Sequence, residues 1–160
     1  MKISSILGLN ARTQIYSYPY NTARGKKIAA SKILTHRILK KFGVPSPVIL
    51  KIFREPRDIV DFEWKKLADS FVLKPSKGYG GEGIIVVKSK LEDGKWLTTQ
   101  KNTVTVDDLK LHILDILEGA YSIGNVPDVA FIQEYVPRHY AFRKYAFRGT
   151  PDIRVIIFNK

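Results

Sequence analysis

The chain contains no cysteine and a single methionine among its 160 residues. Without cysteine there can be no disulfide framework and no thiolate metal site. Long apolar runs are also missing, since none approaches the roughly 20 residues that a membrane-spanning helix needs. The opening segment MKISSILGLN has one lysine and a short apolar patch broken by serines, so it does not resemble a signal peptide. We therefore expect a cytoplasmic protein that does not span a membrane.

Acidic residues are few relative to basic ones. The sequence has 27 Lys and Arg against 15 Asp and Glu, a net charge of +12 at pH 7. This charge favours an anionic partner, which is either nucleic acid or the phosphates of a nucleotide. In RHYAFRKYAFR, at residues 138–148, aromatic and basic residues interleave in a way that can supply phosphate contacts and base stacking. A basic nucleic-acid-binding module is therefore one hypothesis for this chain.

The periodicity of apolar residues predicts a mixed protein of helices and strands. Residues 1–30 show no clean period and are expected to be extended segment and loop. Helices are predicted over residues 31–42, 55–70 and 105–122. A hairpin turn is predicted around Asp93-Gly94. Five apolar, β-branched runs are predicted to be strands: VILKIF, FVLKP, GIIVVKS, VAFIQEYVP and PDIRVIIFNK.

A glycine cluster lies between two of these strands, in FVLKPSKGYGGEGIIVVKS at residues 71–89. Its spelling fits G-x-G-x-x-G, but a dinucleotide-binding unit needs a helix next, and Ile84–Val87 favours a strand. The loop does not end in Gly-Lys-Ser/Thr, so it is not a Walker phosphate-binding loop. The catalytic-loop and Asp-Phe-Gly motifs of protein kinases are also missing from the sequence. Lys74 ends an apolar strand just before the glycines, where a lysine is costly unless it pairs with an anion. The combination favours a hairpin loop that holds phosphate with its backbone N–H groups.

Five segments in a fixed order resemble the ATP-grasp superfamily, in particular its α-L-glutamate ligase-like, sugar-transfer-associated branch. The resemblance covers nearly the whole chain. The segments are Asn10-Ala11-Arg12 with Pro19-Tyr20-Asn21, Lys32 with FGVPSP, FVLKPSKGYGGEGIIVV, AFIQEYV and PDIRVIIFN.

This resemblance implies an α+β (α/β) fold, the ATP-grasp fold, with ATP between two lobes. The expected units are an N-terminal helical and extended segment over 1–70, a glycine-lid subdomain over 71–130, and over 131–160 a hinge strand with the start of the C-terminal lobe. Because the last predicted strand is followed only by Asn159 and Lys160, we expect an incomplete fold and a truncated chain.

The resemblance also implies roles for individual residues. Lys32 and Lys74 would contact the ATP phosphates, with Lys74 also near the adenine. The lid over the β- and γ-phosphates would be formed by Gly78, Gly80, Gly81 and Gly83. The hinge strand would be Gln133, Glu134, Tyr135 and Val136, whose main chain reads the adenine edge. Asp152 would bind the ribose hydroxyls, and Arg154 would be the catalytic residue that reaches the phosphates or an acyl-phosphate.

Ordinary structural roles compete with several of these assignments. Lys32 could be an exposed helix lysine, and Glu134 a solvent-facing residue on an edge strand. Asp152 could be a turn acid and Arg154 the partner of any nearby carboxylate. The three histidines, which have no metal-ligand spacing, are expected at the surface: His36, His112 and His139.

The chemistry implied by the resemblance is ATP-dependent ligation of a small-molecule or peptide carboxylate to an amine. A substrate carboxylate would attack the γ-phosphate of Mg-ATP, and the amine would then displace phosphate. The Mg²⁺ ligands of the family are expected beyond residue 160, so no metal site is assigned and the chain alone is expected to have little or no activity. Ser31 stands where the family usually has an acidic residue. A degenerate, non-catalytic paralogue is the remaining alternative.

Overall fold

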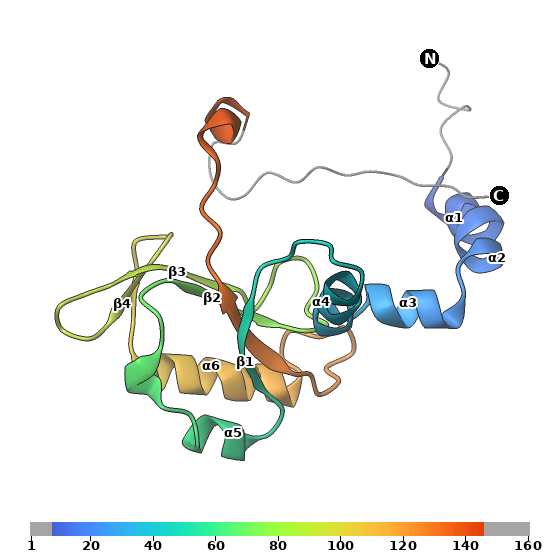
Figure 1. The fold of residues 1–160 in the computed structure, drawn as a ribbon. Coiled ribbons are helices and arrows are strands. Elements are labelled where there is room, and N and C mark those ends of the chain that lie inside the picture. The colour runs from blue at the N-terminus through green and yellow to red at the C-terminus, as the bar shows by residue number, and fades with distance from the viewer. Residues whose placement is uncertain (1–7, 146–160) are drawn as a thin grey trace.

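The computed structural model describes residues 8–145, which form one antiparallel sheet with helices around it (Figure 1). The sheet has six strands in the order β1-β6-β2-β3-β4-β5. The strands are β1 Ile49–Phe53, β2 Phe71–Pro75, β3 Ile85–Lys90, β4 Trp96–Thr98, β5 Thr103–Val104 and β6 Ala130–Glu134. The mixed α and β class predicted from the sequence is confirmed. The predicted strand over 151–160 lies outside the described residues.

Strand β6 lies inside the sheet, between β1 and β2, although it is the last of these strands in the chain. On one side Ile132 pairs with Leu73 of β2, and on the other with Lys51 of β1. The sheet therefore joins strands from all three of the units expected over 1–70, 71–130 and 131–160. That division into units remains a prediction.

Helix α6, Val106–Glu118, covers one face of the sheet (Figure 1). It begins with a capping box, in which Thr105 Oγ1 accepts from the amide of Asp108 at 3.1 Å and Asp108 Oδ2 accepts from the amide of Thr105 at 2.8 Å. It ends at Gly119, which has a φ of 92° and so provides the left-handed cap that a side chain would strain. These end signals fix the length of the predicted third helix.

The hydrophobic core lies between α6 and the sheet. Leu109, Ile113 and Ile116, spaced as one stripe of a helix, are fully buried there. The strands contribute every second residue because alternate side chains point to the same face. The large strand side chains in this core are Phe53, Phe71, Leu73, Val87, Trp96 and Ile132.

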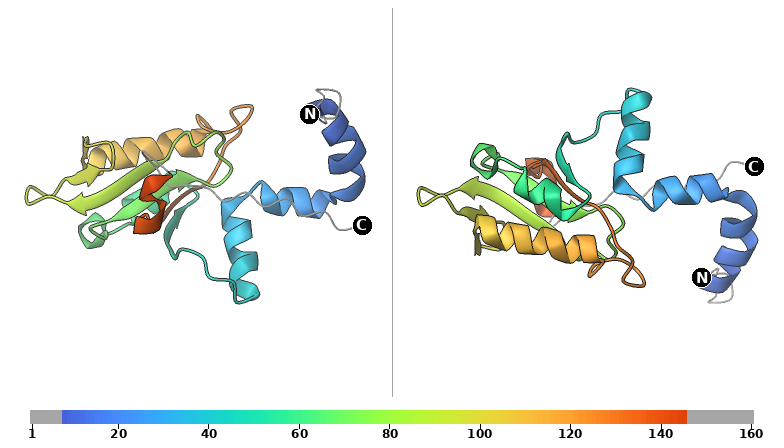
Figure 2. Two further views of the ribbon diagram at one scale, coloured as in Figure 1. Left: turned by 90° about the horizontal axis from the view of Figure 1, so that it is seen from above. Right: turned by 90° about the horizontal axis from the view of Figure 1, so that it is seen from below.

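The N-terminal residues differ from the prediction of extended segment and loop. They form a helical arm, made of α1 Leu9–Arg12, the π-helical η2 Thr13–Ser17, α2 Tyr18–Tyr20 and α3 Ala23–Ala29. The arm extends away from the sheet in each view (Figure 2). None of its side chains is buried, so it has no apolar stripe of the kind that reveals a helix in a sequence. The prediction was wrong because it relied on that stripe.

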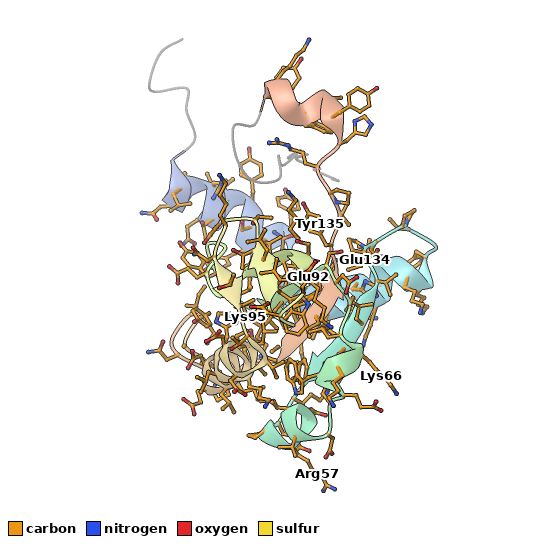
Figure 3. All side chains as sticks on the ribbon, turned by 90° about the vertical axis from the view of Figure 1, so that its left-hand side faces the viewer. Arg57, Lys66, Glu92, Lys95, Glu134 and Tyr135 are labelled. Atoms are coloured by element: carbon orange, nitrogen blue, oxygen red, sulfur yellow. The ribbon has the colours of Figure 1, made fainter. Side chains whose placement is uncertain are left out.

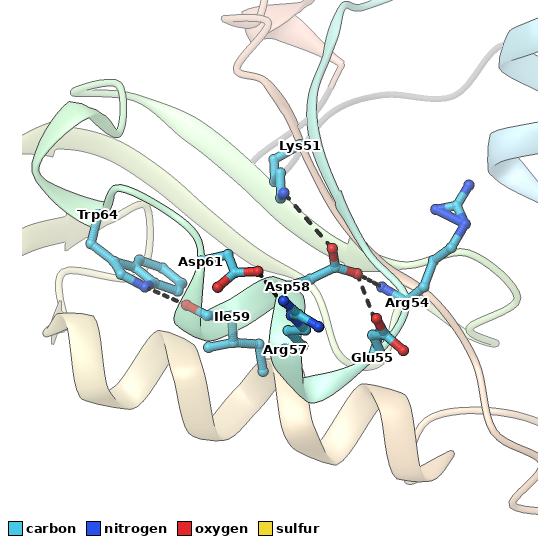
Figure 4. A network of polar contacts seen from close by, with 8 residues as sticks. All are labelled: Lys51, Arg54, Glu55, Arg57, Asp58, Ile59, Asp61 and Trp64. Atoms are coloured by element: carbon cyan, nitrogen blue, oxygen red, sulfur yellow. Dashed lines mark hydrogen bonds and ion pairs between the residues drawn. The ribbon is translucent and has the colours of Figure 1, made fainter.

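The segment 55–70 is also not the single helix that was predicted. It forms the short helix α5, Pro56–Val60, and one 3₁₀ turn, Trp64–Lys66. The Trp64 indole donates to the carbonyl of Ile59 at 3.0 Å (Figure 4). In a continuing helix this carbonyl would instead accept from the backbone amide four residues later. Val60, the last residue of α5, is 81% exposed.

Helix α5 begins where Asp58 folds back on the preceding backbone. Asp58 Oδ2 accepts from the amides of Arg54 at 2.7 Å and Glu55 at 3.3 Å (Figure 4). These bonds, led by that from Arg54, lower the pKa of the Asp58 carboxyl because they stabilise its charged form.

The first predicted helix and the predicted hairpin turn are confirmed. Helix α4, Lys32–Lys41, falls within the range predicted for the first helix, and Gly43 beyond it has a φ of 68°. The hairpin turn between β3 and β4 closes through the amide of Leu91, which donates to the carbonyl of Lys95 at 2.8 Å. Within residues 8–145, no helix is both long and apolar enough to cross a membrane.

A substitution at Ile113 can measure how much the packing between α6 and the sheet stabilises the fold. We expect Ile113→Ala to lower the free energy of unfolding by about 2–5 kcal/mol, because it leaves a cavity in a closely packed core. The matched control is Leu111→Ala on the same helix, where the side chain is 62% exposed and the change should stay within about 0.5 kcal/mol. Urea denaturation measures both, and equal losses would contradict the assigned core.

Candidate functional site

A pocket of about 330 Å³ lies between α4 and the sheet. Its sheet residues, among them Lys74 and Gln133, alternate with the core residues along β2 and β6, so the pocket is on the face opposite α6. The polar and aromatic side chains that line it include Lys32, His36, Ser46, Lys74, Phe131 and Gln133. Two of the cations predicted from the sequence therefore meet in one pocket.

Lys32 is placed by the bonds that join the start of α4 to the end of β2. Ser31 caps the helix, since its Oγ accepts from the amide of Leu34 at 3.3 Å, and it lies 3.0 Å from Ser76 Oγ. The backbone amide of Lys32 donates to the carbonyl of Ser76 at 3.0 Å. The serine that stands at the usual acidic position thus caps the helix and fixes its first turn.

The ammonium group of Lys32 contacts the glycine loop, residues 78–83. Nζ donates to the carbonyl of Gly78 at 2.9 Å and is 3.5 Å from that of Ser76. Burial lowers the pKa of Lys32, and the negative charge of Asp128 partly offsets this. Lys32 is therefore not the fully exposed helix lysine of the alternative interpretation.

Lys74 is the second cation of the pocket. It lies opposite Phe131 of β6, with Nζ 5.5 Å from the centre of that ring. Burial lowers the pKa of Lys74, and the positive charge of Lys32 lowers it further. Two half-buried cations that destabilise each other's charge favour an anion between them.

Asp128 supplies the negative charge near Lys32, and sequence reasoning did not single it out. Its Oδ2 accepts from the amide of Lys77 at 2.6 Å, and the residue is only 6% exposed. Its Oδ1 is buried and has no hydrogen-bond partner among the described residues. The sequence feature that could have identified Asp128 is its position, because it is an acidic residue directly before the apolar run that begins at Val129.

The glycine loop connects β2 to β3, as predicted, and most of its glycines are required by the backbone. Gly80, Gly81 and Gly83 have φ values of 62°, 84° and 69°, which L side chains rarely adopt. At Gly78 an added Cβ would lie 2.1 Å from Pro75 Cγ. At Gly80 and Gly81 it would meet nothing within 4 Å, so the loop is tightly packed at its ends and open at its tip.

His112 is not the simple surface residue that was predicted. It is half-buried on α6, and its Nε2 lies 2.9 Å from the carbonyl oxygen of Gly83. His36 lines the pocket one turn after Lys32 and lies 3.1 Å from Ser46 Oγ through its Nδ1. His139 accepts from the amide of Ala141 at the start of a 3₁₀ turn, Tyr140–Lys144.

The expected hinge strand corresponds to the end of β6 and the residues after it (Figure 3). Gln133 is buried and lines the pocket. Glu134 is not on an edge strand: its Oε1 accepts from the amide of Val48 at 2.8 Å, and its own amide donates to the carbonyl of Val48 at 2.9 Å. Tyr135 is half-buried and Val136 is 54% exposed. Of the four, Gln133 is the one that lines the pocket.

Two predicted site residues, Asp152 and Arg154, lie outside the described residues. Among residues 8–145, no group of three or more His, Asp or Glu side chains could hold a metal ion. The two ammonium groups brought together in the pocket are cationic and fit an anionic ligand.

The charge distribution along the chain also favours an anionic ligand at this pocket. Residues 1–54 contain eleven Lys and Arg and no Asp or Glu, so nearly all of the net charge of +12 comes from this part. That part supplies α4 and β1, which form one side of the pocket. A positive field on one side of a cleft concentrates anions there.

The family model described as sugar-transfer associated ATP-grasp matches residues 11–160. No curated protein and no solved structure matches the chain significantly.

The coupling of the two lysines can be measured directly. We expect Lys32→Met to raise the pKa of Lys74 towards the ordinary lysine value, because it removes the like charge that opposes protonation. Side-chain NMR titration of Lys74 is the measurement, with Lys27→Met on the exposed side of α3 as the control. A Lys74 titration unchanged by Lys32→Met would show that the two charges do not interact.

The lowered pKa also predicts an effect on stability. Between the folded-state pKa of Lys74 and the ordinary value of 10.5, the unfolded chain binds more protons, so stability rises with pH across that window. Below the window the charged lysine destabilises the fold. Lys74→Met should therefore raise the Tm of the ligand-free protein at pH 7, and this gain should shrink as the pH rises through that window towards 10.5. A lower Tm at pH 7 would contradict the prediction.

Proposed function

The chain belongs to the sugar-transfer associated ATP-grasp family, whose model matches residues 11–160, and on that basis we propose that the pocket between α4 and the sheet binds ATP for a ligase-like reaction. The mixed helical and antiparallel architecture is consistent with an ATP-grasp-type domain. The residues that carry the proposal are Lys32 and Lys74, which come from different elements into one pocket.

The observation that carries the proposal is the meeting of two half-buried lysines in that pocket, where Asp128 offsets the charge of Lys32 only in part. Both lysines have a lowered pKa because burial removes water from their ammonium groups. A phosphate group placed between them would supply the missing negative charge and restore both pKa values. Lysine is well suited to this role because it acts as a compact, movable point charge.

The glycine loop is proposed to close over the β- and γ-phosphates. Its tip, Gly80-Gly81, is open, and glycines there let backbone N–H groups approach phosphate oxygens closely. Gly78 and Gly83 would form its two ends. Because Lys32 Nζ already bonds to the carbonyl of Gly78, a phosphate bound by Lys32 would also lie at the start of the loop.

The base and sugar are assigned by the family pattern. Gln133 and the main chain from Glu134 to Val136 are proposed to lie along the adenine, next to Lys74. Asp152 is proposed to bind the ribose hydroxyls. Arg154 is proposed to act on the transferred phosphoryl group.

The proposed reaction joins a carboxylate to an amine. A carboxylate oxygen of the first substrate would attack the γ-phosphorus, the bond to the β-phosphate oxygen would break, and ADP would leave. The amine of the second substrate would then attack the acyl carbon, releasing phosphate and forming the amide. Mg²⁺ would neutralise phosphate charge when bound. The part played by the described residues is to hold and orient the phosphates.

A second candidate, nucleic-acid binding, is favoured by two exposed tyrosines. Tyr140 and Tyr145 are 73% and 84% exposed within the basic, aromatic segment 138–148. Binding to RNA that weakens steeply with added salt would support this function. It would leave the pocket and the glycine loop without a role, so we rank it second.

Mg-ATP binding tests the first proposal. Isothermal titration calorimetry should show that Lys74→Ala weakens binding about 10- to 100-fold, since it removes a hydrogen bond between charged groups. Lys88→Ala, at an exposed position on the neighbouring strand β3, is the matched control and should bind as the unaltered protein does. No binding by the unaltered protein, or equal binding by Lys74→Ala, would overturn the proposal.

A further inference from the structure

Two side chains next to the glycine loop have no part in the pocket. His112 is on α6 and Tyr121 follows that helix, on the other side of the loop from α4. Their rings lie 5.1 Å apart and are tilted by 37°. A histidine and a tyrosine that face each other beside a functional loop need an explanation, because the nucleotide pocket does not include them.

Hydrogen bonds connect the two side chains to the end of the loop. A carbonyl oxygen can only accept, so the 2.9 Å contact between His112 Nε2 and the carbonyl of Gly83 places a proton on Nε2. In the neutral ring Nδ1 is then an acceptor, and the Tyr121 hydroxyl, 3.3 Å away, donates to it. The chain of donors therefore runs from Tyr121 through His112 to the loop.

Tyr121 also contacts the loop in two ways of its own. Its carbonyl accepts from the amide of Tyr79 at 3.3 Å. Its ring fills the space beside Gly83, where an added Cβ would lie 2.6 Å from Tyr121 Cγ. A larger residue at position 83 would therefore be disfavoured both by the positive φ and by the Tyr121 ring packed against the backbone.

The two ends of the loop are held by different elements. At the start, Lys32 of α4 bonds to the carbonyl of Gly78. At the end, His112 bonds to the carbonyl of Gly83. Only the tip between them, Gly80-Gly81, has open space on the side where a Cβ would point.

We propose that His112 and Tyr121 are positioning residues that fix the end of the glycine loop, so that only its tip moves when a nucleotide binds. This proposal rests on the ATP-binding function proposed above. A loop that is already ordered at both ends loses less conformational entropy on closing over the phosphates, and affinity rises accordingly. The pair acts through the loop and does not touch the nucleotide.

The first experiment needs no nucleotide. Hydrogen exchange at the amides of Tyr79 and Glu82, which both donate within the loop region, should become about tenfold faster in His112→Leu. His112→Gln retains an N–H donor near the position of Nε2 and should restore most of the protection. Tyr121→Phe keeps the ring but removes the hydroxyl, and should give a smaller change of about threefold.

Local and general effects are separated by controls. Leu111→Ala, one residue away on the same helix and outside the loop contacts, should leave exchange in the loop unchanged. Exchange at the amide of Leu109, in the buried part of α6, reports whether a variant has loosened the whole helix. Equal exchange at Tyr79 and Glu82 in His112→Leu and the unaltered protein would overturn the proposal, and so would a failure of His112→Gln to restore protection while Leu109 stays protected.

The second experiment measures Mg-ATP affinity in the same variants. His112→Leu should weaken binding about three- to tenfold and His112→Gln much less. If loop exchange changes as expected but ATP affinity does not, the pair orders the loop without serving nucleotide binding, and the positioning role is overturned. If the unaltered protein binds no ATP, the proposed function fails, while the exchange measurements still decide whether the pair holds the loop.

Discussion

The packing of α6 against the sheet is the interaction on which the other features depend. Leu109, Ile113 and Ile116 give the sheet its covered face, and without them the strands would have no core. The same helix presents His112 to the end of the glycine loop, so the burial of one stripe fixes the position of another side chain on the helix. At Gly119 the chain turns back so closely that an added Cβ would lie 2.6 Å from the backbone of Val126. Helix α6 therefore contributes both to the core and to the support of the end of the glycine loop.

The pocket shows a compromise between stability and binding. Lys32 and Lys74 repel each other and are both partly removed from water, which disfavours the ligand-free fold. Asp128 relieves this at Lys32 only in part, and one of its own oxygens is buried without a hydrogen bond. Such local costs are common at binding sites, because the groups that would bind the ligand are arranged for its charge and not for the empty pocket.

Sequence reasoning succeeded where a local pattern is itself the physical cause of the structure. The helices α4 and α6, the hairpin turn after β3, and the glycine loop between β2 and β3 all belong to this class. Lys74 was identified by a cost that the sequence makes visible, namely a cation at the end of an apolar strand, whereas Lys32 was identified only through the family resemblance.

It failed where structure depends on contacts between distant residues or on their absence. The helical arm at 9–29 buries nothing, so its helices leave no period to detect. The break after Val60 depends on an indole that reaches back to the carbonyl of Ile59. The bond from His112 joins residues that are 29 positions apart, and nothing near His112 in the sequence indicates its partner.

The strand order has a consequence for how the chain folds as it is made. Because β6 lies between β1 and β2, β1 has no partner strand and β2 has only β3 until Glu134 has left the ribosome. During that interval β1 and one side of β2 present unpaired backbone edges, which are sites where chains aggregate. Contacts between residues far apart in sequence also form slowly. The yield of folded protein is therefore expected to depend on how quickly β6 is synthesised and pairs with β1 and β2, more than on the final stability of the sheet.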